Sequence, residues 1–274
     1  MKTILYIHGM GGGEDSRIPA FLNDWFGENQ PDIRVVVRTY DFHPERAAAQ
    51  IDAWYAELQP DLVIGESLGS VHALALYSRF HPGCGSTAPL RDRETYPSGG
   101  MSLRSAPLPQ PANAEAKLAP PLLLVSPALN APKFLYAMRI PARIPAIQKL
   151  LNRIYKPREG RRQALDFTPE TLTAWGAYRI FWRSQDPGVC AHGEAFPEGS
   201  LSLLPWGHRL PDPTTTQVYA FFGRRDHYRR SGVVSLKQWR RTFGPGTYAL
   251  YDGTHFMEET YLRELLIPAI RERI

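Results

Sequence analysis

The sequence is poor in cysteine and contains no long apolar run. Its two cysteines, Cys84 and Cys190, lie far apart among 274 residues, with no Cys-x-x-Cys spacing. This spacing indicates neither a disulfide framework nor a zinc site. No apolar run approaches the length that spans a bilayer, and the first residues turn polar too soon for a secretory signal peptide. We therefore expect a cytoplasmic protein without a membrane span.

Acidic residues are scarce in the later part of the chain. Residues 131–274 hold 22 lysines and arginines against 13 acidic residues, whereas residues 1–130 hold 10 against 14. A basic excess of this kind attracts anionic substrates or nucleic acid. The arginines are scattered, however, and no recognised nucleic-acid-binding motif accompanies them. We expect a solvated basic surface and no nucleic-acid partner.

Strand-like and helix-like segments alternate along the chain. Apolar runs of strand length occupy residues 3–7, 33–39, 61–65, 122–125, 217–222 and 248–251. Helical patterns include residues 16–26, 44–58 and 258–273. Strands joined by helical crossovers form a mostly parallel sheet with helices on both faces, whose active sites lie at the carboxyl ends of the strands. The length fits a single α/β domain over residues 1–274, with about six strands.

Two segments interrupt this alternation. Residues 81–120 are rich in Pro, Gly and Ser, which predicts a surface insertion without a packed core. Residues 130–213 are helical in pattern, and an insertion between two late strands folds over the carboxyl edge or the outer face of the sheet, as a candidate lid or cap. Its aromatic stripe either lines an acyl pocket or packs the helix on the main body. The stripe consists of Leu172, Trp175, Tyr178, Phe181 and Trp182.

A serine stands at the apex of a predicted strand-turn-helix. The pentapeptide Gly65-Glu66-Ser67-Leu68-Gly69 follows the third apolar run and leads into a helical pattern. A serine on so sharp a turn adopts a strained backbone conformation, and side chains two positions before and after it would collide with the strand or the helix. The turn exposes the hydroxyl of Ser67 and aims the backbone N–H of Leu68 at whatever the serine attacks. A tight turn with a bystander serine is the alternative.

A glycine-rich loop follows the first predicted strand. It begins with His8, Gly9, Met10 and Gly11. A dinucleotide-binding loop would need a glycine at position 14, where the chain has Glu14. We therefore interpret the segment as an oxyanion loop, whose glycines let the backbone point the N–H of Met10 toward the nucleophile. His8 is expected to have a structural role, through a hydrogen bond to the backbone.

These motifs, with an aspartate after the fifth strand and a histidine after the sixth, resemble the α/β-hydrolase superfamily, whose chain order is Ser, acid, His. The abrupt start of the first strand is similar to small bacterial serine esterases that lack the usual leading hairpin. The resemblance covers the sheet-forming parts of the chain and implies an α/β-hydrolase fold. It makes Ser67 the nucleophile, His255 the base and Asp226 its orienting carboxylate. It also makes the backbone N–H groups of Met10 and Leu68 the oxyanion donors.

Two rivals stand close to the proposed acid and base. His227 directly follows Asp226, but His255 follows the last strand, in the setting that the superfamily uses. Asp252 is near His255 in sequence, but it belongs to the same turn, where its carboxylate would brace that turn instead. Arginines flank Asp226 on both sides. We expect them to point outward; the alternative is that one of them meets an anionic group of a substrate.

These roles predict a serine hydrolase that cleaves a carboxylic ester through an acyl-enzyme and uses neither metal nor cofactor. The same site suits a thioesterase or an acyltransferase, with basic groups receiving the phosphates of a CoA-like carrier. A non-catalytic α/β-hydrolase-like binding protein is the rival hypothesis from a different class. The partner expected for the enzyme is a small-molecule ester or acyl substrate, and the sequence leaves the oligomeric state open.

Overall fold

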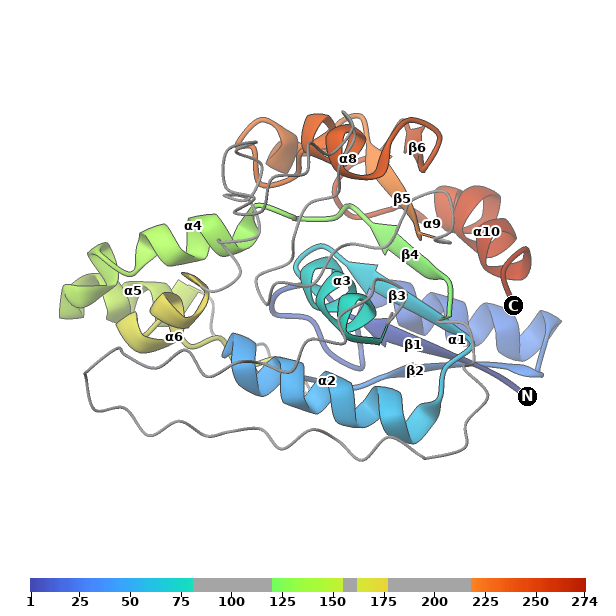
Figure 1. Cartoon of the computed structure of the whole chain (residues 1–274), viewed down its shortest axis with the longest axis horizontal. Helices are drawn as coiled ribbons and strands as arrows, with labels where there is room; N and C mark the ends of the chain where they lie inside the picture. The colour runs from blue at the N-terminus through green and yellow to red at the C-terminus, as the bar shows by residue number, and fades with distance from the viewer. Residues whose placement is uncertain (81–119, 155–161, 177–217) are drawn as a thin grey trace, which may run out of the picture.

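The computed structural model describes residues 1–80, 120–154, 162–176 and 218–274. Within these ranges it contains a six-stranded sheet of order β2-β1-β3-β4-β5-β6, in which every pair of neighbouring strands is parallel. The strands are β1 (Lys2–Ile7), β2 (Ile33–Val37), β3 (Leu62–Glu66), β4 (Leu122–Val125), β5 (Val218–Gly223) and β6 (Tyr248–Tyr251). The predicted parallel sheet of six strands is confirmed (Figure 1).

Helices cover both faces of the sheet because the buried strands are apolar on both sides. Successive residues of β1 alternate between two core clusters: Leu5 and Ile7 pack with α2, α3 and α8, while Ile4 and Tyr6 pack with α1 and the C-terminal helices. All four residues of β4 are fully buried. The α-helices are α1 (Arg17–Asn29), α2 (Pro44–Leu58), α3 (Gly69–Phe80), α4 (Ala131–Met138), α5 (Pro145–Ile154), α6 (Pro169–Ala174), α8 (Leu236–Phe243), α9 (Glu259–Tyr261) and α10 (Ile267–Arg271).

Two helical regions differ from the sequence-based expectation. The C-terminal helix is interrupted by a π-helical turn, η4 (Leu262–Leu266), between α9 and α10. This turn ends two residues before Pro268, near the start of α10, and proline has no N–H to donate to the carbonyl of Glu264, which disfavours a continuous α-helix. Helix α8 was not predicted, although Ser235 caps it by accepting a hydrogen bond from the N–H of Gln238.

The described part of the predicted 130–213 insertion forms α4, η1 (Pro141–Arg143), α5 and α6. These helices lie together at the left of Figure 1, beyond the carboxyl ends of the strands. None of the described helices is long and apolar enough to cross a membrane. The predicted 81–120 insertion lies outside the described residues except for residue 120, so its character stays a prediction.

The first residues of the aromatic stripe pack on the main body of the protein. Leu172 and Trp175 are fully buried, and the ring of Trp175 lies 5.8 Å from that of Phe42, centroid to centroid. For these two residues, packing accounts for the pattern. Tyr178, Phe181 and Trp182 lie outside the described residues.

Candidate active site

Ser67 sits on the turn between β3 and α3 with φ of 50°, a left-handed conformation that is uncommon for a residue with a side chain. A Cβ atom on Gly69 would lie 2.2 Å from the carbonyl oxygen of Ile7, and one on Gly65 would lie 2.8 Å from the Cα of Ser70. The backbone of Ile7 cannot move without disrupting the sheet, and that of Ser70 cannot move without disrupting α3. The strained turn and both collisions expected from the sequence are present in the structure.

Ser67, His255 and Asp226 form a continuous chain of hydrogen bonds. The Nε2 atom of His255 lies 2.9 Å from Oγ of Ser67, and its Nδ1 atom lies 2.8 Å from Oδ2 of Asp226. The other oxygen of Asp226 accepts a hydrogen bond of 2.8 Å from the N–H of Tyr228. Because an ionised carboxylate only accepts hydrogen bonds, Nδ1 carries the ring proton and Nε2 is left to accept the hydroxyl proton of Ser67. The three side chains come from the carboxyl ends of β3, β5 and β6.

The two rival residues point elsewhere. The side chain of Asp252 is 72% exposed and forms an ion pair with Arg225 at 3.4 Å. His227 is exposed, and its ring centroid is 6.2 Å from that of His255. The structure therefore places His255, rather than His227, in contact with Ser67, and Asp226, rather than Asp252, in contact with His255.

The arginines around Asp226 leave its carboxylate to His255. Arg225 pairs with Asp252, and Arg229 donates to the backbone carbonyl of Gly223 at 3.2 Å. Among the described residues, no arginine forms an ion pair or a hydrogen bond with Asp226, whose side chain is completely buried. This arrangement agrees with the expectation that the arginines point away from the carboxylate.

The glycine loop after β1 is fixed from outside by Gln163. The side-chain oxygen of Gln163 accepts a hydrogen bond of 3.0 Å from the N–H of Gly11, and the backbone N–H of Gln163 donates to the carbonyl oxygen of Gly12 at 2.7 Å. No described residue accepts a hydrogen bond from the N–H of Met10 or of Leu68. Both residues line the cavity beside Ser67, so these two donors are available to an oxygen atom bound there.

His8 has the structural environment expected for it. It is fully buried, its Nδ1 donates to the carbonyl of Gly9 at 2.7 Å, and its ring stacks on that of Tyr40 at 4.4 Å. Burial lowers the pKa of His8 to about 4, because the charged imidazolium would lose its hydration. His8 is therefore neutral in the folded protein at neutral pH.

This pKa predicts a pH-dependent stability. The folded-state pKa of about 4 lies below the ordinary value of 6.5, so the unfolded chain binds more protons between these two pH values. The free energy of unfolding is expected to be unaffected by His8 above pH 6.5 and to lose about 3 kcal/mol from this group as the pH falls to about 4. Urea unfolding at pH 7.5 and pH 4.5 measures the loss. The variant His8→Asn, which keeps a donor near Nδ1 but does not titrate, should lose less stability than the wild type; an equal loss would contradict this account.

Glu66, directly before Ser67, was not predicted to be part of the site. It lines the cavity, and its Oε2 atom accepts a hydrogen bond of 2.7 Å from the hydroxyl of Tyr6. Burial raises the pKa of the Glu66 carboxyl, while the hydrogen bond from Tyr6 opposes this shift. The sequence shows Glu66 inside the serine motif, but its partner lies 60 residues away, so only the sheet brings them together.

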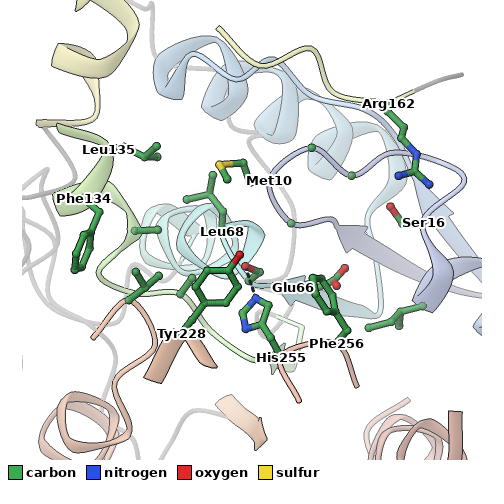
Figure 2. Close-up of a pocket in the computed structure, with 18 of the residues that line it drawn as sticks. Met10, Ser16, Glu66, Leu68, Phe134, Leu135, Arg162, Tyr228, His255 and Phe256 are labelled. Atoms are coloured by element: carbon green, nitrogen blue, oxygen red, sulfur yellow. Dashed lines mark hydrogen bonds between the residues drawn. The ribbon is translucent and has the colours of Figure 1, made fainter. Parts of the chain in front are cut away.

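The cavity at Ser67 has a volume of about 460 Å³ and two chemically different ends (Figure 2). At one end the walls are apolar, formed by α4 and the loop after β5: Ala131, Phe134, Leu135, Met138 and Val233. At the other end, beside the apolar Ile18 and Phe256, polar groups of the glycine loop and its surroundings line the cavity: Gly11, Gly12, Ser16, Arg17, Glu66 and Arg162. In Figure 2, His255, which is hydrogen-bonded to Ser67, lies between the two ends. The sequence indicated helical material over the site but not which of its residues form the wall.

No known family model matches the chain. Its structure is similar to that of a monoacylglycerol lipase from Paleococcus ferrophilus, with a TM-score of 0.51 and 14% identity, over 98% of this chain and 92% of the other. It is also similar to a putative hydrolase from Agrobacterium vitis S4, with a TM-score of 0.52 and 13% identity, over 100% of this chain and 88% of the other. The protein therefore has the α/β-hydrolase fold expected from its motifs.

Proposed function

We propose that this protein is a serine hydrolase that cleaves a carboxylic ester through an acyl-enzyme. The observation that supports this most strongly is the chain of hydrogen bonds from Ser67 through His255 to the buried carboxylate of Asp226. A serine hydroxyl is a weak nucleophile at neutral pH and needs a neutral imidazole to take its proton. The imidazole needs a carboxylate to fix its tautomer and to stabilise its protonated form. Both requirements are supported by the hydrogen bonds of His255, which reach Ser67 in the cavity on one side of the ring and the buried Asp226 on the other.

In the first half of the reaction, Oγ of Ser67 attacks the ester carbonyl carbon while its proton passes to Nε2 of His255. The electron pair of the carbonyl bond moves onto oxygen, and the N–H groups of Met10 and Leu68 stabilise the resulting charge. When the tetrahedral intermediate collapses, the bond to the alcohol oxygen breaks and His255 gives that oxygen the proton. The acyl group is left on Ser67 and the alcohol leaves.

In the second half, water attacks the acyl carbon and loses a proton to Nε2 of His255. A second tetrahedral intermediate forms in the same oxyanion site, and its collapse breaks the bond to Oγ of Ser67. His255 returns the proton to Oγ, and the carboxylic acid is released. Asp226 remains ionised throughout, because its role is to hold the ring and stabilise its charge.

The two ends of the cavity support a substrate with two unlike parts. An aliphatic part fits against Leu135, Met138 and the other apolar residues of α4. A polar part fits against the glycine loop, Ser16 and Glu66, which offer hydrogen-bonding groups. We infer an ester of a fatty or other aliphatic group with a polar, hydroxyl-bearing group.

The apolar end predicts a dependence on chain length. In a series of p-nitrophenyl esters, kcat/KM is expected to rise by about fourfold per added methylene until the apolar end is filled, because burying each CH₂ contributes about 0.8 kcal/mol. The variant Met138→Ser should flatten this rise, since a polar side chain then faces the chain. Ile140→Ser is the matched control, because Ile140 is exposed and does not line the cavity. A flat series in the wild type would contradict this assignment of the apolar end.

Labelling with a fluorophosphonate tests the function as a whole. We expect a single adduct by intact mass, mapped to Ser67, with no adduct in Ser67→Ala and greatly slowed labelling in His255→Ala. A folded protein that forms no adduct would rule out an activated serine and favour the non-catalytic binding protein instead.

A thioesterase on the same triad is the second candidate. It is favoured by a second hollow, of about 700 Å³, which is lined by the loop that carries Asp226. Its cationic walls, which suit the phosphates of a carrier, are Arg224, Arg225, Arg229, Arg230 and Lys237. Measuring kcat/KM for the ester and for the CoA thioester of the same acyl chain separates the two candidates. A higher value for the thioester would favour the thioesterase.

A further inference from the structure

Exposed apolar side chains gather on the helices beside the cavity. Four of them lie on or between α4 and α5: Phe134 (42% exposed), Ile140 (61%), Ile144 (53%) and Leu150 (53%). Among the described residues, the other large apolar side chains that are exposed are Met1, Met10 and Phe256. The last two line the cavity, so six of these seven side chains belong to residues 134–150 or line the cavity. Such a concentration marks a contact with another apolar phase or a partner.

The same segment is strongly cationic. Residues 131–154 contain no Asp or Glu and five cations: Lys133, Arg139, Arg143, Lys149 and Arg153. Four of them are exposed and Arg139 is partly exposed, with its guanidinium over the ring of Tyr136 at 3.6 Å. None forms an ion pair with another residue in the described ranges. We call these five cations and the four exposed apolar residues the α4–α5 surface.

This composition fits a lipid bilayer better than a protein partner. The core of a protein interface is depleted of charged residues, which lie on its polar rim, whereas cations and exposed apolar residues alternate along residues 133–153. Helices that lie on membranes combine exposed Leu, Ile and Phe with Lys and Arg, because the apolar groups enter the acyl boundary while the cations meet anionic headgroups. The absence of any acidic residue from 131–154 completes the charge complementarity with an anionic surface.

Helix α4 connects this surface to the cavity. Phe134 belongs to both, since it is exposed and lines the cavity, and Leu135 and Met138 of the same helix line the apolar end. In Figure 1, α4 and α5 project from the body of the protein at one end. In Figure 2, Phe134 and Leu135 lie on the α4 side of the site, opposite Ser16 and Arg162. A bilayer against α4 and α5 would therefore face the apolar end of the cavity.

We propose that the α4–α5 surface binds the protein peripherally to an anionic lipid bilayer and presents the apolar end of the cavity to it. Binding itself requires only the surface. The presentation of a membrane-borne ester to Ser67 rests on the proposed function.

Vesicle binding tests the surface directly. The wild type should sediment with phosphatidylglycerol vesicles and far less with phosphatidylcholine vesicles, and added salt should release it. The double variant Lys149→Gln/Arg153→Gln should lower the partition coefficient by about 25-fold, since each cation near an anionic surface contributes about fivefold. The double variant Arg34→Gln/Arg271→Gln removes the same charge at two exposed positions outside this surface and should bind like the wild type.

A reporter at an exposed position tests the apolar contact. The fluorescence of Ile144→Trp should shift to the blue on adding phosphatidylglycerol vesicles and should be quenched by brominated acyl chains. Ile140→Ser/Ile144→Ser should lose vesicle binding and the hydrolysis of esters held in vesicles, while keeping the hydrolysis of soluble short-chain esters. Ser67→Ala should bind vesicles like the wild type and hydrolyse neither substrate, so failure of the surface and failure of the proposed function are distinguishable.

Three results would overturn the proposal: no sedimentation with phosphatidylglycerol vesicles, binding that the α4–α5 variants leave unchanged, or no shift of the Ile144→Trp fluorescence. Sedimentation-velocity ultracentrifugation tests whether a second copy of the chain binds to this surface instead. If the wild type does not bind vesicles but forms a dimer, and the substitution Ile140→Ser/Ile144→Ser dissociates that dimer, the surface is an interface between two copies of the chain. This result would overturn the proposal as well.

Discussion

Replacing Ser67 by alanine is expected to lower kcat for ester hydrolysis by about 10⁶-fold, because it removes the attacking atom while every other group of the site remains. The φ of 50° at this position is strained for alanine as it is for serine, so the fold should be retained. Steady-state rates and far-ultraviolet circular dichroism on the same preparation measure the two properties together.

A second serine in the same cavity provides the control. Ser16 lines the polar end and accepts a hydrogen bond from the N–H of Gly13, but it does not contact His255. Ser16→Ala should therefore change kcat by less than about tenfold, a loss that corresponds to one neutral hydrogen bond. If Ser67→Ala kept a rate within tenfold of the wild type, the nucleophile would have to lie elsewhere and the proposed mechanism would fail.

The second large effect is expected at the acid. Asp226→Asn should lower kcat by about 10⁴-fold, although the side chain keeps its size and its place in the core. The amide can present an N–H to Nδ1 of His255, and the ring then carries its proton on Nε2, where it can no longer accept the proton of Ser67. The loss should appear in kcat, with KM changed little, because Asp226 is buried behind the ring and does not reach the substrate.

Asp252→Asn is the matched control for this substitution. Asp252 is only three residues from His255 in sequence, but its carboxylate is exposed and faces Arg225. Its loss should cost less than about 1 kcal/mol of stability, as expected for an exposed ion pair, and should leave kcat within about threefold. A larger loss of kcat in Asp252→Asn than in Asp226→Asn would reverse the assignment of the acid.

Much of the fold and the main features of the site could be predicted because they depend on local patterns. Apolar runs of four to six residues mark strands that are buried on both faces, as β4 is, and each is followed by a turn with a recognisable composition. The glycines around Ser67 are needed by the turn itself, so the motif carries its own geometry. The C-terminal π-turn and α8 were missed because their signals, Pro268 and the Ser235 cap, are weaker than an apolar pattern.

The remaining features of the site depend on residues that are distant in sequence. Gln163 holds the glycine loop across 152 residues, and Tyr6 meets Glu66 across 60. Neither pairing leaves a trace in the local sequence, since a glutamine after an insertion and a tyrosine in a strand have many ordinary roles. The contact of His255 with Asp226 rather than with Asp252 also depends on the tertiary structure, because the loops after β5 and β6 determine which carboxylate points inward.

The sequence by itself determined the order of strands and helices and the turn that exposes Ser67, because apolar periodicity and the conformational freedom of glycine act over a few residues. Only the tertiary structure brings the side chains of His255 and Asp226, which the resemblance named, into one hydrogen-bonded chain with that serine, and only it decides which face of α4 forms the cavity wall. Those outcomes depend on the parallel arrangement of β3, β5 and β6 in one sheet, which brings the carboxyl ends of these strands to the same edge.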